Sequence, residues 1–488
     1  MADQNQNPQW FQPKGRPVGG TEHSWCRAVS GGTGITVLAL QFTKPPNTSL
    51  LQNALHKLQN SHPILLSKLF HSTTTNTFSF TTPTPTTTPP IQIKSFNLSS
   101  TTHLLRNLST TTSFSPLHII LEHELNNNVW SNNPSNLSCT GIDLFFASLY
   151  ELPDAKWVVV LTLHTVVCDS TTAVGLLREL KGLMMEGEGG GGTQMEMVSG
   201  GEVSLGIEDL IPSGKAKKPI WAHGLDMLSY SLNSLRSTNL KFEDVKGARC
   251  SKVVRLQLSA RETDQILNGV AAGCKSRGMK LCGVLVAAGL MAAHSSNNTQ
   301  NNKKKKKKYA AVTLTDCRSL LEPPLSTLHF GFYHSAILNM HVVNGGESLW
   351  DLASKSYTDF ANSKKHNKHF SDMADTNFLM CKVIENPSLT SASSLRTSLI
   401  SVFEDPVINQ FDEAKDQEIE LEDYMGCSSI HSVGPSIAIF DTIRGGRLDC
   451  VCVYPSPLHS REQMQDLVDR MKRILVDSSD SSVEAIEI

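Results

Sequence analysis

Short runs of apolar residues alternate along the chain with stretches in which apolar residues recur every three or four positions. Residues 34–42 predict a buried strand, and residues 48–58 place their leucines on one helical face. That helix is expected to end near His62, because the residue before a proline avoids helical backbone angles. A second apolar run at 156–164 is followed by an amphipathic helix that begins near Asp169.

The second half of the chain repeats this alternation. Strands are predicted at 251–258 and 309–315, and helices at 263–277 and 281–294. Near the C-terminus, Gly445-Gly446 supplies the positive φ of a hairpin turn between strands at 435–441 and 447–454. A helix then begins at Ser460, with Gln463 three residues later as in a capping box. Both halves are therefore predicted to be mixed α/β.

The length of 488 residues suggests two or three domains at about 150 residues each. We expect an N-terminal domain at 1–215, a crossover connector at 216–243 and a C-terminal domain at 244–488. Three segments of biased composition interrupt the pattern and are expected to be an extended loop or hairpin tip, a flexible linker and a solvated loop, in that order. They are the Thr/Pro-rich 72–90, the Gly-rich 186–201, and 295–308 with its six lysines.

Charge and composition exclude several classes of protein. The 44 Lys and Arg nearly balance the 46 Asp and Glu, so we expect no binding of nucleic acid through bulk charge. No apolar run reaches the roughly 18 residues of a membrane-spanning helix, and no secretory signal is visible. The 11 cysteines form no CxxC pair, which favours reduced thiols in a cytoplasmic protein. No pattern supports a metal, dinucleotide or P-loop site.

The segment from His164 to Asp169 has the one arrangement of residues that suggests catalysis. A buried strand ends at His164, a short loop follows, and a helix begins near Asp169. An imidazole at such an edge can act as a general base near neutral pH. The structural alternative is that Asp169 caps the helix and His164 is a hydrogen-bonded strand end.

Together with two other segments, these residues resemble the CoA-dependent acyltransferase superfamily. One is the segment 53–65, in which a helix ends near His62-Pro63, and the other is Thr-Asp-Cys-Arg at 315–318. The superfamily includes chloramphenicol acetyltransferase, the plant HxxxD acyltransferases, the mycobacterial polyketide-associated acyltransferases and peptide-synthetase condensation domains. The order and spacing of the segments over most of the chain carry the resemblance.

The resemblance implies two similar chloramphenicol-acetyltransferase-like α/β domains with mixed sheets and an active-site channel between them. It implies a monomeric acyltransferase that moves an acyl group from acyl-CoA, or a carrier-protein thioester, to a small alcohol or amine, with no other cofactor. His164 would be the base, and Asp169 would pair with Arg318 as structural support. Ser429 and His431 lie where the superfamily has a loop near the channel, while His329 and His334 lie along the domain interface.

The chain departs from the superfamily pattern of His-x-x-x-Asp. Thr165, not His164, stands four residues before Asp169, and the Asp-Phe-Gly-Trp-Gly motif of the plant branch is absent. In one interpretation Thr165 occupies the position of the base and lines the channel, and the protein is a catalytically degenerate binding or interaction module. In the other, the loop has gained a residue and His164 still points into the channel. Either way the chain is an atypical relative.

Overall fold

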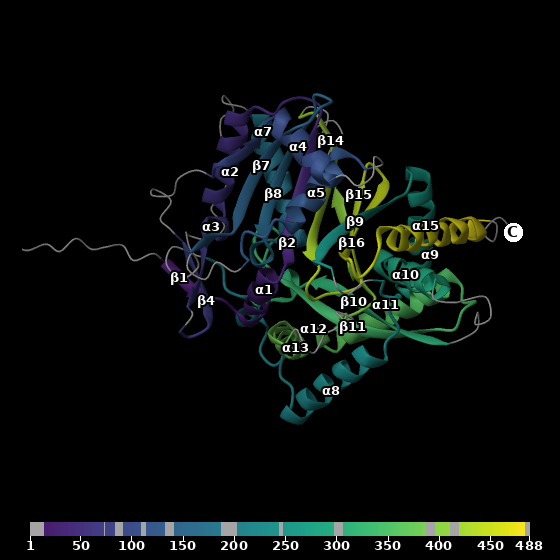
Figure 1. The fold of residues 1–488 in the computed structure, drawn as a ribbon. Helices are drawn as coiled ribbons and strands as arrows, with labels where there is room; N and C mark the ends of the chain where they lie inside the picture. The colour runs from purple at the N-terminus through teal and green to yellow at the C-terminus, as the bar shows by residue number, and fades with distance from the viewer. Residues whose placement is uncertain are drawn as a thin grey trace, which may run out of the picture.

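The computed structural model describes residues 14–72, 74–82, 91–108, 114–131, 141–186, 203–243, 247–296, 306–386, 396–409 and 419–483. The chain is mixed α/β, as predicted, and its strands form a five-stranded, a seven-stranded and a four-stranded sheet. Figure 1 shows the five-stranded sheet at the upper left and the seven-stranded sheet to its right.

The five-stranded sheet belongs mainly to the first half and has the order β14-β2-β8-β7-β5. Its strands are β2 (Thr33–Phe42), β5 (Ile93–Phe96), β7 (Phe145–Glu151), β8 (Trp157–His164) and β14 (Leu421–Ile430). One face packs against α2 (Thr48–Ser61) and α7 (Ser170–Glu186). The other packs against α5 (Pro116–Asn126) and its neighbour α4 (Leu98–Leu108). Burial on both faces explains why β2 and β8 are almost continuously apolar.

A smaller sheet lies at the edge of this half, next to α1 (Gly20–Ser30) and the short α3 (Pro63–Leu66). Its order is β1-β4-β3-β6. The strands are β1 (Lys14–Pro17), β3 (Lys68–Ser72), β4 (Thr77–Thr82) and β6 (Ile142–Asp143). The Thr/Pro-rich segment therefore begins with a hairpin tip between β3 and β4, but its residues 77–82 form β4 itself and bury Phe78 and Phe80 in the core, which the loop prediction missed.

The seven-stranded sheet belongs to the second half and has the order β11-β10-β12-β15-β16-β9, with β13 beside β15. Its strands are β9 (Cys250–Gln257), β10 (Lys307–Asp316), β11 (His334–Val343), β12 (Ile400–Phe403), β13 (Val407–Asn409), β15 (Ile437–Arg444) and β16 (Arg447–Ser456). Four helices cover one face: α9 (Ala260–Arg277), α10 (Leu281–Ser296), α11 (Leu349–Lys365) and α15 (Arg461–Val483). α10 is apolar all round because it is buried on every side.

Strand β14 joins the two halves. It comes from the C-terminal part of the chain, yet it pairs antiparallel with β2, and Ser428 lies opposite Thr36. The other face of the seven-stranded sheet also contributes Val253 and Val451 to the core beneath α5. The two halves therefore share a hydrophobic core in addition to this exchanged strand.

The remaining described elements are three 3-10 turns and three helices. They are the 3-10 turns η2 (Thr165–Val167), η3 (Ile207–Leu210) and η4 (Arg318–Leu320), and the helices α8 (Ile220–Arg236), α12 (Lys368–Ser371) and α13 (Met373–Glu385). Most of the predicted connector is therefore helical. Within the described residues, no helix is both long enough and apolar enough to cross a bilayer.

Local predictions from the sequence hold at several element ends. α2 ends at Ser61 with His62 as its C-cap, and Gly445 and Gly446 have φ of 53° and 70° in the β15–β16 turn. The backbone N–H of Gln463 donates to Ser460 Oγ over 3.1 Å, while its side-chain amide donates to the Lys241 carbonyl. Only half of the expected capping box is thus present. Residues 73, 83–90, 187–201 and 297–305 of the three biased segments lie outside the described residues.

Candidate active site

The chain passes from β8 into α7 through one 3-10 turn. β8 ends at His164, η2 covers Thr165–Val167, and α7 begins at Ser170. Asp169 caps α7, because its Oδ1 accepts the backbone N–H of Thr172 over 2.8 Å. The capping role considered for Asp169 on the sequence alone is thus present.

The structure brings Asp169 and Arg318 together, although 149 positions separate them. Arg318 Nη1 lies 2.9 Å from Oδ2 and Nη2 lies 3.1 Å from Oδ1, so the pair is bidentate. Both side chains are almost fully buried, at 2% and 1% exposure. Arg318 also donates to the carbonyl of His329, and Asp169 accepts the backbone N–H of Tyr333. The pair therefore fixes the loop before β11 against the start of α7.

The electrostatics of the pair follow from this geometry. Burial acts to raise the pKa of the Asp169 carboxyl, but Arg318 and His334 outweigh it and hold the pKa well below its usual range. Asp169 is therefore an anion at any physiological pH. Its lone pairs are already occupied by Arg318, His334 and two backbone amides.

His164 lies on the face of the sheet that packs against α5. It pairs with Ile35 across β2, and its Nδ1 accepts the N–H of Val166 over 3.2 Å. Its ring meets the edge of Trp130 with 5.2 Å between centroids. The side chain is 1% exposed, and burial lowers the pKa of His164 to about 3. The structure thus gives His164 the surroundings of a packed strand end, and its catalytic role stays a prediction.

The side chain of Thr165 lies among hydroxyl groups and not beside the rings that surround His164. Its Oγ1 donates to the carbonyl of Gly34 over 2.5 Å and lies 3.1 Å from Thr36 Oγ1, which lies 2.8 Å from Ser428 Oγ. Gly34 has φ of +95°, and a Cβ there would lie 3.1 Å from Thr165 Oγ1. A row of hydroxyls, rather than an imidazole, thus occupies the seam between β2, η2 and the exchanged strand β14.

Ser429 and His431, predicted to line a channel, both make contacts that hold the end of β14. Ser429 Oγ accepts the N–H of Ile35 over 3.0 Å, and His431 Nδ1 lies 3.0 Å from Ser251 Oγ. The His431 ring lies above Gly32, where a Cβ would come 1.9 Å from Nε2. Burial and nearby arginines lower the pKa of His431 to about 4. A role for either residue toward a ligand stays a prediction.

Asp169 also belongs to a chain of three residues that the sequence patterns did not connect, and Ser170 is not among the predicted site residues. His334 Nδ1 is 3.0 Å from Asp169 Oδ2, and its Nε2 is 3.1 Å from Ser170 Oγ. Serine, imidazole and carboxylate thus form a continuous hydrogen-bonded chain. His334 is buried, whereas Ser170 is half-buried. No local motif could reveal this chain, because His334 and Ser170 are 164 positions apart.

Partly exposed aromatic rings extend from His334 in both directions. Phe332 lies 6.4 Å from the His334 ring and 5.2 Å from Trp25 of α1. Phe403 lies 5.7 Å from His334 on the other side and 5.5 Å from Phe440. All four flanking rings are half-buried. This aromatic row, Trp25-Phe332-His334-Phe403-Phe440, follows the junction of the two halves and offers apolar surface beside Ser170.

Among the described residues, one group of three carboxylates is compact enough for a metal ion: Asp226, Asp372 and Asp375. The ammonium of Lys218 already lies among them, 2.8 Å from Asp372 and 3.0 Å from Asp375, and it also pairs with Asp226. The lysine therefore supplies the cation that this group needs.

No protein-family model and no curated protein matches the sequence. Solved structures do match over nearly the whole chain. The trichothecene 15-O-acetyltransferase of Fusarium sporotrichioides has a TM-score of 0.65 at 13% identity, covering 95% of each chain. The epimerization domain of the third module of tyrocidine synthetase B has a TM-score of 0.61 at 12% identity, covering 96% of this chain and 97% of that one.

Polyketide synthase associated protein 5 from Mycobacterium tuberculosis matches with a TM-score of 0.56 at 13% identity, covering 96% of this chain and all of the other. Identities this low show the fold alone. The chain therefore has the chloramphenicol-acetyltransferase-like fold of two similar mixed α/β domains that acyltransferases and condensation domains share.

Proposed function

We propose that this protein binds a small acylated or apolar ligand between its two halves and lacks the histidine-dependent acyl transfer of the superfamily that it resembles. One observation carries the proposal. The residue four positions before Asp169 is Thr165, and its hydroxyl lies in the hydroxyl row with Thr36 and Ser428. A threonine hydroxyl cannot take up a proton near neutral pH as an imidazole does.

The surroundings of His164 support the same proposal. A general base works best when its pKa lies near the working pH, and burial lowers the pKa of His164 to about 3. Its ring also lies on the α5 face of the sheet, whereas Thr36 and Ser428 project from the opposite face. An acceptor bound beside the hydroxyl row would thus have the sheet between itself and the imidazole.

The structural neighbours support a role that need not be acyl transfer. These neighbours include an acetyltransferase, an epimerization domain, and an X-domain in complex with OxyB from teicoplanin biosynthesis. The same fold thus serves different purposes, and the residues of the site must decide between them. In this chain the aromatic row supplies half-buried apolar surface of the kind that binds acyl chains or rings.

The experiment compares binding with turnover in the same protein. CoA and several acyl-CoAs are mixed with the wild type, with and without small alcohols and amines, while the melting temperature and thiol release are measured. We expect a ligand to raise the melting temperature without thiol release above the protein-free rate. Thr165→His tests whether a base at this position creates turnover, with His164→Ala as the matched control. The proposal would be overturned if the wild type released thiol and His164→Ala abolished that release.

A second function is favoured by the chain from Ser170 through His334 to Asp169. In this candidate the protein does transfer an acyl group from acyl-CoA, or a carrier-protein thioester, to a hydroxyl or amine. Ser170 Oγ attacks the thioester carbonyl while His334 Nε2 takes its proton, and the thiolate leaves and receives that proton. The acceptor then attacks the acyl-serine, gives its proton to His334, and Ser170 regains a proton as it leaves.

This candidate ranks second because Arg318 already neutralises Asp169, which weakens the carboxylate as a partner for a protonated His334. Ser170→Ala and His334→Gln test it, with Thr171→Ala as the neighbouring hydroxyl control. Acyl transfer would be lost in the first two variants and kept in the third. Intact-mass measurement on the wild type would then show the mass of one added acyl group. If that added mass were absent and Ser170→Ala kept full turnover, Ser170 would be rejected as the nucleophile.

A further inference from the structure

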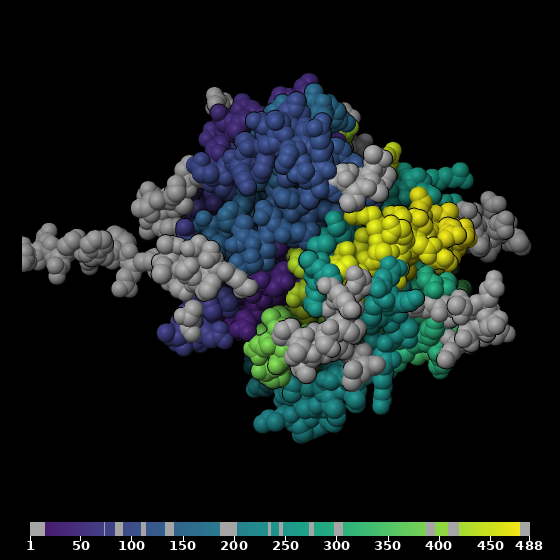
Figure 2. All heavy atoms as spheres, viewed as in Figure 1, coloured from purple at the N-terminus to yellow at the C-terminus, as the bar shows by residue number. Residues whose placement is uncertain are grey.

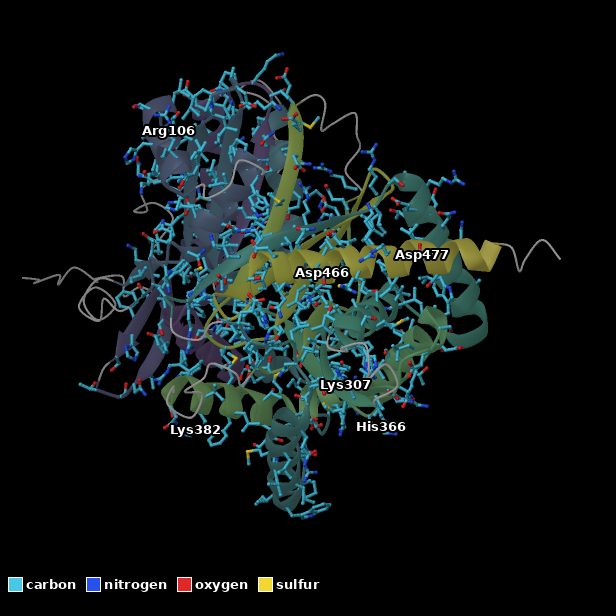
Figure 3. The ribbon with its side chains drawn as sticks, turned by 45° about the vertical axis from the view of Figure 1, so that its right-hand side comes forward. Arg106, Lys307, His366, Lys382, Asp466 and Asp477 are labelled. Carbon is cyan, nitrogen blue, oxygen red and sulfur yellow. The ribbon has the colours of Figure 1, made fainter. Side chains whose placement is uncertain are left out.

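Helix α8 presents an apolar face to solvent. Trp221, Leu225, Leu228 and Leu232 are 70%, 58%, 56% and 38% exposed. Their spacing of four, three and four residues places them on one side of the helix, and we call them the α8 stripe. Figures 1 and 3 show α8 at the lower edge of the molecule, projecting away from both large sheets. In Figure 2 it forms the lower edge of the surface.

The inner face of α8 is polar, which reverses the usual arrangement of a surface helix. Tyr230 donates its hydroxyl to Asp372, and His223 Nδ1 lies 2.6 Å from Asp375 Oδ1. Asp226 pairs with Lys218, which also holds the two carboxylates of α13 and its cap. Hydrogen bonds and ion pairs thus hold α8 to the body of the protein. The apolar side chains of the helix are left on the outside, in position to contact another surface.

Charges beside the α8 stripe are positive. Lys215 and Lys217 are exposed directly before the helix, and Arg236 is exposed at its end. Asp226 is the single acidic residue between positions 212 and 236, and it faces inward to Lys218. The α8 stripe thus has cationic side chains at both ends, and the one carboxylate of the helix is on its inner side. This arrangement is complementary to a bilayer whose head groups are anionic and whose interior is hydrocarbon.

The size of the stripe distinguishes between two occupants. A stable protein–protein interface uses about 20–30 residues on each side. Four side chains on one projecting helix fall far short of that, whereas a helix lying flat on a bilayer immerses only its apolar face. The stripe is about 17 Å long at 1.5 Å per residue, and its tryptophan is a residue type enriched at membrane–water interfaces.

We propose that α8 docks the protein on the surface of an anionic lipid bilayer, through the α8 stripe and the lysines before it. The inference goes beyond ligand binding between the halves and does not depend on it. It places the protein on a membrane through a helix that lies along the surface.

The experiment uses the full chain and vesicles of phosphatidylcholine with or without phosphatidylserine. We expect the wild type to sediment with the anionic vesicles and to bind neutral ones at least tenfold more weakly. Trp221→Ser combined with Leu228→Ser should weaken binding to anionic vesicles at least tenfold, with an unchanged melting temperature because both side chains are exposed. Leu98→Ser on α4, at 42% exposure in the wild type, is the matched control and should bind normally.

Charge reversal gives a second, independent readout. Lys215→Glu with Lys217→Glu should abolish the preference for phosphatidylserine and reduce the loss of binding caused by added salt. Absence of binding by the wild type at low salt would overturn the proposal, as would equal binding by the stripe variant and the Leu98 control. A wild-type dimer in light scattering that the stripe variant converts to a monomer would also overturn it, since a second copy would then be the occupant.

Discussion

Glu122 and Arg461 join the two halves of the protein through an ion pair in which Arg461 Nη2 donates to both carboxylate oxygens, each over 2.8 Å. Glu122 lies on α5 of the first half, and Arg461 begins α15 of the second. Burial acts to raise the pKa of Glu122, but His118 and Arg461 outweigh it and lower the pKa to about 2. The carboxylate also accepts the N–H of Val253 over 2.7 Å. One side chain thus ties α5 to both β9 and α15.

Replacing Glu122 by glutamine tests this tie. The side chain keeps its size but loses the charge that Arg461 and Lys252 face. We expect a loss of about 2–3 kcal/mol in the free energy of unfolding, measured in urea. That is less than the 3–5 kcal/mol of a fully buried pair, because Arg461 is 24% exposed.

Glu422→Gln is the control for that substitution. Glu422 pairs with Lys156 over 2.7 Å, but the two side chains are 38% and 30% exposed. The loss should therefore stay below about 1 kcal/mol. Equal losses in the two variants would mean that Glu122 does not hold the halves together.

Substitution of Asp169 by asparagine should be more costly, at about 3–5 kcal/mol, because Arg318 then keeps a buried charge without its carboxylate. The measurement is again urea unfolding, with Asp316→Asn as the control. Asp316 also contacts Arg318 over 3.1 Å but is 32% exposed, so its removal should cost about 1 kcal/mol or less. A variant of Asp169 as stable as the wild type would contradict a structural role for this pair.

Much of the fold could be predicted from local patterns. The buried runs at β2 and β8 and the amphipathic α7 appear in the sequence because burial dictates residue type position by position. The place of β14 could not be predicted in this way, since its partner β2 lies more than 370 positions earlier. An alternating pattern shows that a strand has two faces, but not which distant strand it joins.

In the candidate site, too, short motifs predicted some contacts and could not predict others. The Asp169–Arg318 pair followed from the resemblance, because the two short motifs occur in the expected order. Whether Thr165 or His164 faces the exchanged strand depends on how one 3-10 turn follows the end of β8, and a shift of one residue reverses the face. The contact of His334 with Ser170 depends on how β11 meets α7, which no local pattern encodes.

Buried histidines should make stability depend on pH. Burial lowers the pKa of His164 to about 3 and that of His459 to about 4. A histidine whose pKa is lower in the folded state than in the unfolded state contributes to stability as long as its imidazole is neutral. Its contribution is complete above the unfolded pKa of about 6.5 and is lost as pH falls toward the folded pKa. Stability should therefore fall from pH 6.5 to 4.5, by up to about 1.4 kcal/mol per pH unit for each such histidine.

Urea unfolding at several pH values checks this dependence, and His164→Asn isolates one contribution. The slope of the unfolding free energy against pH gives the number of protons that the chain takes up on unfolding. Between pH 6.5 and 4.5 this number should be smaller by up to one in the variant. His103→Asn is the control, since His103 lies on the exposed part of α4. An unchanged slope in the His164 variant would show that the imidazole is not held neutral in the folded state.

Lys218 is expected to act as a built-in cation for the carboxylates of Asp226, Asp372 and Asp375. Lys218→Met keeps the length of the side chain but removes the ammonium, so three carboxylates repel one another beneath α8. We expect a loss of at least about 3 kcal/mol in the free energy of unfolding. Calcium prefers several carboxylate oxygens, so it should raise the melting temperature of this variant and not that of the wild type. Lys215→Met, an exposed lysine three positions earlier, should behave like the wild type in both respects, and an equal calcium effect on all three proteins would contradict the assignment.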